Sequence, residues 1–280
     1  MLQIWRYFCK SKLGLLGLGL IFILILSAIF APLITPSGYS EQKYLQEINH
    51  FPSINHWFGV DAVGRDYFTR VIYGIRVSLF VGFAAAMIAL FVGVPLGALA
   101  GYYKGVVDWG VMRLVEIFSV IPALLIAILF VTLVGSGIQN IILIISLVSW
   151  KNICRLVRGE IISLKEREYF ISARAIGAKP GRILFRHLLP NAIAPIIVGL
   201  VVCISQAIML EAMLSFLGIG VNPPIPSWGQ MISDGLYYIQ FYWHLPLFPS
   251  IFLTLTVLSL SFVGNGLRDA MDPKTRGSNW

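Results

Sequence analysis

The sequence predicts an all-α, polytopic membrane protein with six transmembrane helices. Of its 280 residues, 58% are hydrophobic and only 12% are charged, whereas about a quarter of the residues of a soluble domain carry charge. The apolar residues gather in runs long enough to cross a bilayer, for which about 20 residues suffice. The net charge of +8 comes from basic residues divided among short loops. That distribution fits the orientation rule of membrane proteins better than a nucleic-acid-binding stripe.

The first expected span is residues 13–34, a run of 22 residues without charge. It follows Arg6, Lys10 and Lys12, so a cleaved signal peptide is the alternative. Its apolar part is longer than the about 7–15 residues of a signal core, which favours an uncleaved span. Residues 35–76 are polar and contain proline, and we expect them to form an external segment that carries short helices.

The second uncharged run is residues 77–103. Gly93, Gly97, Gly101 and Gly105 recur at every fourth position, which leaves one helix face bare of side chains and lets another helix approach closely. Pro95 is expected to kink this helix, which is tolerable where neighbouring groups satisfy the freed carbonyl.

Residues 117–150 are uncharged over 34 positions, too many for one helix, and are interrupted by Gly-Ser-Gly at 135–137. We divide them into spans near 113–134 and 138–157, with Lys151 and Arg155 reaching toward the interface. Arg113 and Glu116, three residues apart, are expected to form a local ion pair.

The fifth and sixth spans are expected at 188–218 and 246–267, joined by an external loop rich in Pro and Trp. Ser227 and Gln230 predict a capping box at the start of a helix in this loop. The chain then has three parts. They are an N-terminal part (1–76), a five-span core (77–267) with a cytoplasmic loop at 158–190, and a C-terminal tail (268–280).

Six spans place both termini on one side of the membrane. All Lys and Arg residues except Lys43, Arg65, Arg70 and Arg76 fall on that side, which makes 17 of 21. Because basic residues concentrate in cytoplasmic loops, we expect the termini and the 158–190 loop to be cytoplasmic.

Residues 160–190 are the only long hydrophilic passage between apolar runs on that side. Tyr169, Ala173 and Ile176 recur at spacings of four and three, which gives a helix one apolar face. Gly177 and the Lys-Pro-Gly at 179–181 end that helix and turn the chain. Residues 182–187 then form a second short helical turn. Two short helices at a sharp angle make an elbow that can enter a groove on a soluble partner.

The chain carries none of the phosphate-loop, zinc-hydrolase, paired-cysteine or serine-hydrolase motifs. Its three cysteines are scattered, and its four histidines (His50, His56, His187 and His244) are far apart in sequence and divided between the two sides. We therefore expect no catalytic residue, metal site or cofactor in this chain. An energy source such as ATP hydrolysis would belong to a partner, for which the 160–190 elbow is the natural docking element.

The elbow resembles the cytoplasmic loop of bacterial ABC-importer permeases. Their pattern is Glu-Ala-Ala, three residues, Gly, nine residues, Ile, one residue, Leu-Pro, and Ala173, Gly177, Leu189 and Pro190 match it. Ile171 and Ser172 stand at the other Glu-Ala-Ala positions and His187 at the Ile position.

Five further motifs narrow the resemblance. They are Gly-Arg-Asp at 64–66, Tyr-Gly-Ile-Arg-Val-Ser-Leu at 73–79, Arg-His-Leu-Leu-Pro-Asn at 186–191, Leu-Ser-Phe-Leu-Gly at 214–218 and Asn-Pro-Pro-Ile-Pro-Ser-Trp-Gly at 222–229. Together they resemble the second permease subunit of dipeptide, oligopeptide and nickel importers over nearly the whole chain. This implies a MetI-like permease fold and a pore-forming subunit in the bacterial cytoplasmic (inner) membrane. The implied partners are a homologous sister permease, two ATPase subunits that bind ATP and Mg, an extracytoplasmic substrate-binding protein and the surrounding lipid.

The resemblance also places the ATPase contacts on the elbow. The expected contact residues are Glu168, Tyr169, Ser172, Ala173, Arg174, Gly177, Ala178 and Lys179. In this interpretation Ala173 and Gly177 are small so that the bend packs closely, while Arg174 and Lys179 offer charge to the partner. The alternative is a basic amphipathic segment held to anionic lipid.

Glu211 is the one acid deep within an apolar run, toward its external end. Because carboxylates in spans usually face protein or water, we expect it at an outer gate or along the path. The alternative is a structural partner for Arg65, Arg70 or Arg76.

Gln206, Met209 and Met213 share a helix face that suits a pathway, because Met adapts to varied shapes and Gln both donates and accepts hydrogen bonds. Ordinary helix packing is the alternative for either Met. The loop 222–228 either meets an external receptor or caps the pore, or is a stiff connector with Trp228 at the interface.

The expected function is ATP-coupled import of di- or oligopeptides, with nickel or metal chelates as the second substrate class. A self-contained secondary transporter is the rival from another class. It would need an ion relay near mid-membrane, for which chiefly Glu211 is present. A membrane enzyme would need polar groups clustered at one depth, which the sequence lacks.

Overall fold

The computed structural model describes residues 2–175 and 177–271, without the side chains of residues 2–4, 171 and 173–175. Its regular structure over these residues is helical, apart from one isolated bridge between Val60 and Asp66. The helices are α1 (Leu2–Phe8), α2 (Lys12–Ile29), α3 (Ala31–Ile34), α4 (Tyr67–Tyr103), α5 (Gly105–Val120), α6 (Ala123–Val134), α7 (Ile138–Leu164), α8 (Glu168–Ala175), α9 (Pro180–Ile183), the π-helical turn η1 (Leu184–Leu188), α10 (Leu189–Phe216), α11 (Trp228–Leu236) and α12 (His244–Met271).

Six membrane crossings are present when one bent pair of helices counts as a crossing. Five helical segments of the described chain are long and apolar enough to span alone, namely α2, α4, α7, the continuous 180–216 segment and α12. The sixth is α5 with α6, which meet at 87°, so the span expected near 113–134 is a bent pair of helices that begins at Gly105. Pro122 explains the break, because a residue before proline is driven out of the helical region, and Ile121 is extended with ψ 133°.

Helix α4 begins at Tyr67, ten residues before the expected start of the second span. Asp66 caps it, since its Oδ1 accepts hydrogen bonds from the Thr69 backbone N–H and hydroxyl, both at 2.7 Å. Arg70 and Arg76 made this stretch look external, yet the Arg70 side chain is buried and lies 3.5 Å from Asp61. The expected short helices in 35–66 are also absent, since residues 36–66 are turns and extended chain.

The pair α4–α7 forms the centre of the bundle, and the glycines of α4 make it possible. A Cβ on Gly97 would lie 2.4 Å from the Cys154 carbonyl oxygen, and on Gly93 or Gly101 within 3 Å of α7 backbone. The predicted bare face is therefore confirmed for these three glycines. Gly105 does not belong to it, because it begins α5 with nothing within 4 Å of its Cβ position.

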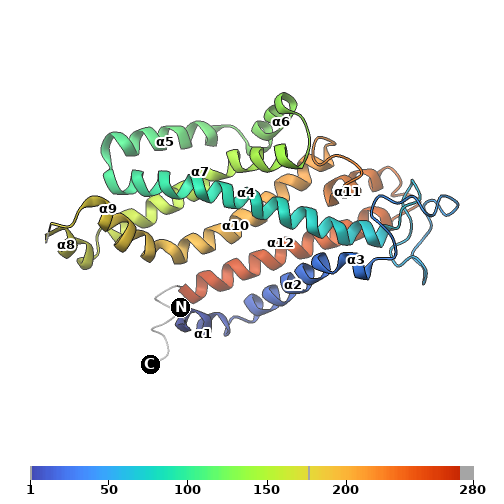
Figure 1. Ribbon diagram of the computed structural model, residues 1–280, viewed down its shortest axis with the longest axis horizontal. Coiled ribbons are helices and arrows are strands. Elements are labelled where there is room, and N and C mark those ends of the chain that lie inside the picture. The colour runs from blue at the N-terminus through green and yellow to red at the C-terminus, as the bar shows by residue number, and fades with distance from the viewer. Residues whose placement is uncertain (1, 176, 272–280) are drawn as a thin grey trace.

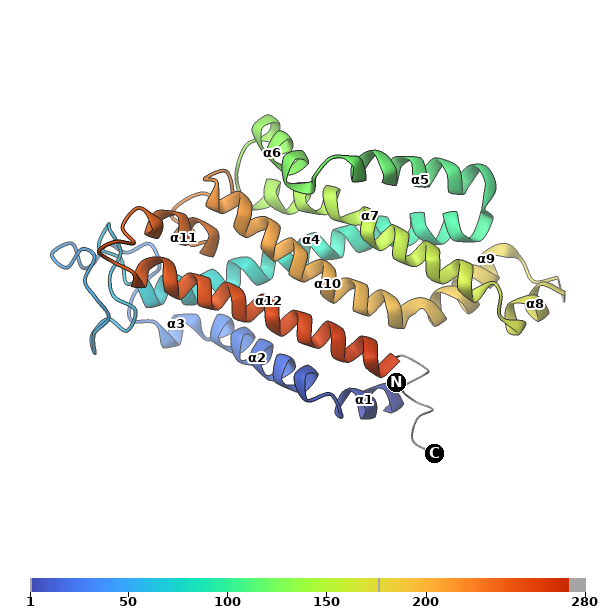
Figure 2. The ribbon, with the colours of Figure 1, turned by 180° about the vertical axis from the view of Figure 1, so that it is seen from behind.

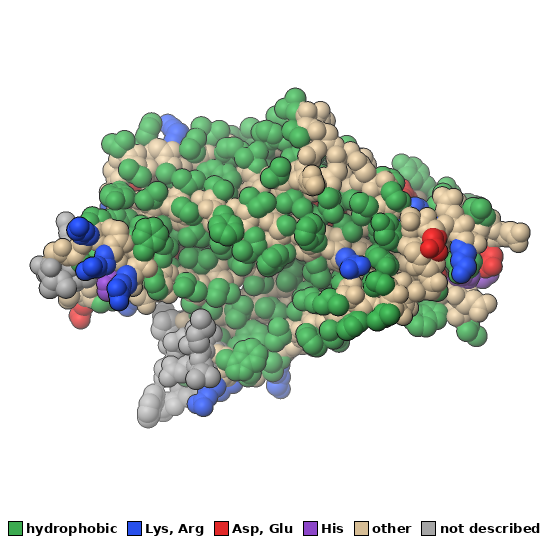
Figure 3. Space-filling model, viewed as in Figure 1, with side chains coloured by type: hydrophobic (Ala, Val, Ile, Leu, Met, Phe, Trp, Pro, Cys, Tyr) green, Lys and Arg blue, Asp and Glu red, His purple; other side chains and the backbone are tan. Residues whose placement is uncertain are grey.

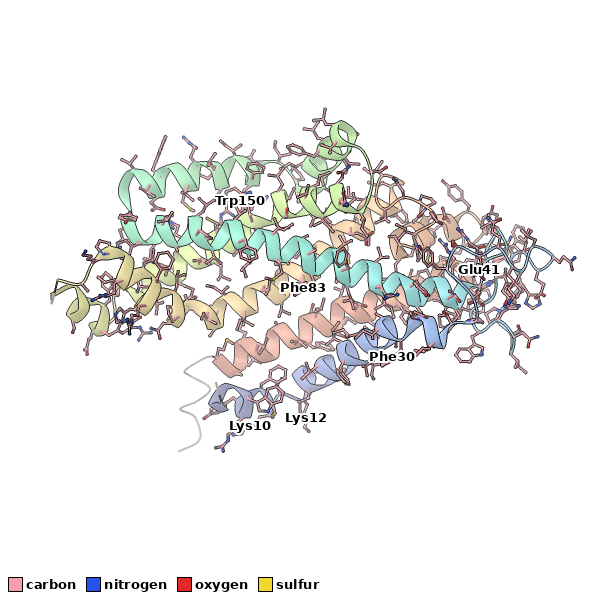
Figure 4. All side chains as sticks on the ribbon, viewed as in Figure 1. Lys10, Lys12, Phe30, Glu41, Phe83 and Trp150 are labelled. Carbon is pink, nitrogen blue, oxygen red and sulfur yellow. The ribbon has the colours of Figure 1, made fainter. Side chains whose placement is uncertain are left out.

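The long helices run side by side along the molecule, with α5 and α6 on one flank (Figures 1 and 2). Helices α1, α8 and α9 lie toward one end, and the 35–66 segment and α11 toward the other. Apolar side chains cover the middle of the visible face and many of the basic ones gather near the α8 end (Figure 3). Lys10 and Lys12 lie toward the same end, and Glu41 at the opposite end (Figure 4). The chain is a multi-pass membrane protein with its described termini toward one side.

The first and last parts of the chain pack on one another. A Cβ on Gly17 of α2 would lie 2.6 Å from the Ser259 carbonyl of α12. Helix α2 therefore packs closely against α12 as part of the helix bundle. Residues 268–271 of the expected C-terminal tail belong to α12, and 272–280 lie outside the described residues.

Candidate functional site

The elbow at 160–190 consists of α8 and α9 with a left-handed residue between them. Gly177 has φ +76°, a conformation that costs glycine little and a β-branched residue much. Pro180 then occupies the first turn of α9, where its missing N–H is harmless. The predicted helix–turn–helix is thus confirmed over its described backbone. The second arm differs, because η1 joins α9 to α10 without a break.

Phe170 anchors the elbow to the bundle, a role that the spacing of Tyr169, Ala173 and Ile176 does not reveal. Its ring is 6% exposed and packs in one apolar cluster with Ile183, Leu184 and Leu188. Tyr169 is 38% exposed, and partial burial raises the pKa of its phenol, so the hydroxyl stays neutral near pH 7.

The expected ATPase contacts are largely on the surface. Glu168, Tyr169, Ser172, Gly177 and Lys179 are exposed and Ala178 is half-buried. The Ser172 hydroxyl donates to the Glu168 backbone carbonyl at 3.0 Å within α8. Ala173 and Arg174 lie in α8, but their side chains are outside the described residues, as is residue 176.

Glu211 lies at the centre of a buried cluster of hydroxyls. Its side chain is fully buried, and its Oε1 accepts hydrogen bonds from Ser215 at 2.7 Å and Ser227 at 2.8 Å. Its Oε2 accepts one from Ser78 at 3.5 Å. The carboxylate thereby links α10 to α4 and to the start of α11.

The alternative of an arginine partner for Glu211 is wrong. Arg65 pairs with Asp61 at 2.6 Å, and Arg70 shares that carboxylate and donates to the Tyr39 and Pro224 carbonyls. Arg76 lies over the Tyr73 ring at 5.6 Å. These three arginines therefore have partners other than Glu211.

Met209 and Met213 line an apolar groove of about 280 Å³ at the half of α10 that adjoins α11. Leu124 of α6, Gly229 and Ile232 of α11 and Leu253 of α12 complete its walls, together with Ala212, Phe216 and Leu217. Gln206 lies outside this groove and accepts a hydrogen bond from Asn152 of α7 at 3.3 Å. The structure thus separates the four predicted pathway residues into an apolar groove, a polar contact with α7 and a buried carboxylate.

The loop before α11 is fastened to the bundle. Ser227 occupies the N-cap position, but the predicted capping box is wrong, because its hydroxyl donates to Glu211 and makes no cap bond. Trp228 is fully buried and its indole N–H donates to the Val71 carbonyl at 3.0 Å. Trp228 is therefore no interfacial anchor.

Three of the four histidines, His50, His56 and His244, lie at the end of the molecule that carries the 35–66 segment. The His50 and His56 rings lie 6.2 Å apart, and Phe51 contacts His244 at 5.1 Å between ring centroids. Within residues 2–175 and 177–271, no three His, Cys, Asp or Glu side chains are placed to share a metal ion.

Residues 93–277 match the family described as binding-protein-dependent transport system inner membrane component. Residues 1–52 match the N-terminal TM domain of oligopeptide transport permease C. The first match covers more than half of the chain.

Relatives of similar length extend these matches. The chain is 45% identical to the dipeptide transport system permease protein DppC of Alkalihalophilus pseudofirmus, over 95% of this chain and 88% of that protein. It is 41% identical to the oligopeptide transport system permease protein OppC of Bacillus subtilis, over 98% and 91%. It is 38% identical to the glutathione transport system permease protein GsiD of Pectobacterium atrosepticum, again over 98% and 91%.

Among solved structures, inward-facing conformations of the MetNI methionine ABC transporter align with a TM-score of 0.60 and 20% identity. The alignment covers 72% of this chain and 97% of the solved one. At that identity the likeness concerns the fold, which is the MetI-like fold expected from the sequence.

Proposed function

The chain belongs to the family of binding-protein-dependent transport system inner membrane components, and from this premise we propose how it couples to its partners. It is a pore-forming permease subunit of an ABC importer, and its family implies a second permease, ATPases and a binding protein. We propose that α8, Gly177 and α9 are the element that the ATPase subunits grip. No covalent chemistry is assigned to this chain.

The observation that carries the proposal is the left-handed Gly177 between two short helices. A turn fixed by one backbone conformation holds the arms at a set angle, and Phe170 binds the first arm to the bundle. The exposed side of α8 presents Glu168, Tyr169 and Ser172. Because the elbow is rigid, anchored to the bundle and exposed, it is suited to transmit a movement of the ATPase subunits to the transmembrane helices.

Both arms continue into transmembrane helices. Three residues separate α7 from α8, and α9 runs through η1 into α10. When ATP draws the two ATPase subunits together, the elbow moves with them and displaces α7 and α10. The pathway then changes the side to which it opens. Transport energy reaches the pore through packing contacts.

We propose that the elbow and both termini face the cytoplasm of a bacterial cell and that the membrane is the cytoplasmic one. This rests on the 17 of 21 basic residues on that side and on the common end of α1 and α8 (Figure 1). The ATP and Mg sites then belong to the ATPase subunits.

We propose di- or oligopeptides as the substrate, because the relatives at 38–45% identity are named for dipeptide, oligopeptide and glutathione transport. Nickel or metal chelates remain the second class. A secondary transporter has less support, since Glu211, the residue it would chiefly depend on, is fully buried and hydrogen-bonded to three serines.

Replacing Gly177 with valine tests the elbow. A β-branched residue at φ +76° is strained, so the turn must change and the arms lose their angle. In the reconstituted complex we expect ATP hydrolysis to persist while substrate uptake falls by about tenfold or more, as loss of a few kcal/mol of coupling would produce.

Gly181→Val is the matched control, because Gly181 has the same open surroundings and no positive φ. We expect it to transport nearly as the wild type does. Normal ATP-driven uptake by the Gly177→Val variant would refute the proposal that the elbow couples ATP hydrolysis to transport. Binding of the elbow to anionic vesicles, with ATPase binding unaffected by Gly177→Val, would favour the lipid-held alternative.

Competition for uptake tests the substrate class. Proteoliposomes that contain the complete complex should accumulate a labelled dipeptide only with ATP and binding protein, and unlabelled di- or tripeptides should compete. Nickel chelates should not. Uptake by this chain alone under an ion gradient would instead establish the secondary transporter.

A further inference from the structure

The basic residues of α7 form a stripe along one face of the helix. Lys151, Arg158 and Lys165 are seven residues apart, close to two full turns, and Arg155 lies between the first two. The sequence suggested that Lys151 and Arg155 reach the membrane interface. Lys151 is instead buried and donates to the Phe118 carbonyl of α5.

The rest of the stripe also contacts α5 and the residues just before it. Arg155 Nη2 donates to the Ser119 hydroxyl at 3.1 Å. Lys165 Nζ donates to the Tyr102 carbonyl at 2.6 Å, where α4 turns into α5. Arg158 makes a bidentate link, with Nε 2.5 Å from Asp108 Oδ1 and Nη2 2.6 Å from Asp108 Oδ2. Two parallel bonds between a guanidinium and a carboxylate fix geometry as well as charge.

Helix α5 packs against the core along one face, through Val111, Met112, Val115 and Phe118. Val115 is its one buried residue, while Val106 and Val120 are each more than 80% exposed. Phe118 adds one ring contact with Trp150 at 5.9 Å, and Figure 4 places Trp150 on α7 beside α5. The 87° bend separates α5 from α6. The polar links from α7 add directional contacts to this apolar packing of α5.

The position of α7 gives these links a consequence for transport. Its far end joins α8 through three residues, and its other face is locked to the glycines of α4. A displacement of the elbow enters α7 first. Without these polar contacts, only the apolar packing of α5 would make it move together with α7.

We propose that Lys151, Arg155 and Arg158 strap α5 to α7, and that Arg158 and Asp108 are positioning residues that make α5 follow the elbow. This proposal rests on the proposed function in one respect, because the movement of α7 is assumed to start at the elbow. The attachment of α5 to α7 is inferred from the contacts alone. The two measurements below test the movement and the attachment separately.

The first measurement is substrate moved per ATP hydrolysed by the reconstituted complex. Asp108→Arg and Arg158→Asp each place like charges together, and each should lower that ratio about tenfold, because bonds to charged groups are worth enough to shift a conformational equilibrium by that factor. The double exchange, Asp108→Arg with Arg158→Asp, restores opposite charges and should recover most of the ratio. Glu116→Gln is the control, because the Arg113–Glu116 pair at 3.2 Å lies exposed within α5 and joins nothing else.

The second measurement is the distance between spin labels at Val106 of α5 and Gly159 of α7, two open positions, after replacement of Cys9, Cys154 and Cys203 by alanine. One narrow distance distribution with and without ATP is expected in the otherwise unaltered chain, and a broad one in Asp108→Arg. This readout does not require the ATPases to grip the elbow, so a failed elbow leaves it unchanged. The strap is overturned if the single variants keep the narrow distribution, or if the double exchange assembles fully and restores neither measurement.

Discussion

Replacing Gly97 with leucine is expected to leave little or no folded chain in the membrane. A Cβ at this position would lie 2.4 Å from the Cys154 carbonyl oxygen and 3.0 Å from Val157 Cβ. Overpacking a core costs about 1–3 kcal/mol when side chains can shift. Here the obstacle is backbone of α7, so α4 and α7 must separate along their main contact. Extraction yield and thermal unfolding in detergent measure the effect.

Gly110→Leu is the control for this substitution. Gly110 also lies inside a helix, yet nothing stands within 4 Å of its Cβ position. We expect its yield and midpoint temperature to stay near those of the unaltered protein. A Gly97→Leu chain with the same midpoint as Gly110→Leu would contradict the close packing of α4 on α7.

Replacing Glu211 with alanine is expected to release α11 from the bundle. The hydroxyls of Ser78, Ser215 and Ser227 would lose their shared acceptor in a site without solvent. Each buried polar group left unpartnered costs about 1–3 kcal/mol, and truncation adds a cavity. Hydrogen exchange of the α11 backbone amides should rise strongly, and the midpoint of unfolding should fall.

Two variants delimit that result. Glu211→Gln keeps an acceptor oxygen for Ser215 and Ser227, so it should retain most of the α11 protection. Asp234→Asn alters an exposed acid on α11 itself and should change little. Unaltered protection in Glu211→Ala would mean that the hydroxyl cluster does not hold α11.

Several features of the structure could be predicted from the spacing of residues within one segment. The interval of four between Gly93, Gly97 and Gly101 predicted a close contact with another helix, though not which one, and Gly177 with Pro180 predicted the elbow turn. Apolar run length gave the six crossings. These features are local, so neighbouring residues determine them. The Arg113–Glu116 pair, confirmed at 3.2 Å, belongs to the same class.

Contacts between distant segments were not predictable in this way. Ser78 and Glu211 are 133 residues apart, and Asp108 and Arg158 are 50 apart. Charge alone suggested that Arg70 and Lys151 lie in water, whereas folding gives them carbonyl and carboxylate partners. The bend at Ile121 did have a local signal in Pro122, which the long uncharged run concealed.

The length of α4 determines how far the outer segment stands from the lipid. Its 37 residues extend about 55 Å at 1.5 Å per residue, whereas the hydrocarbon layer is about 30 Å thick. Even at a tilt of 40°, the upper end of the usual range, the helix covers about 42 Å along the membrane normal. Because the charged residues of α4, Arg70 and Arg76, both lie near Tyr67, we expect the surplus length at that end of the helix. Residues 35–66 would therefore lie beyond the lipid headgroups. We expect a protein that binds these residues to do so with little dependence on lipid composition.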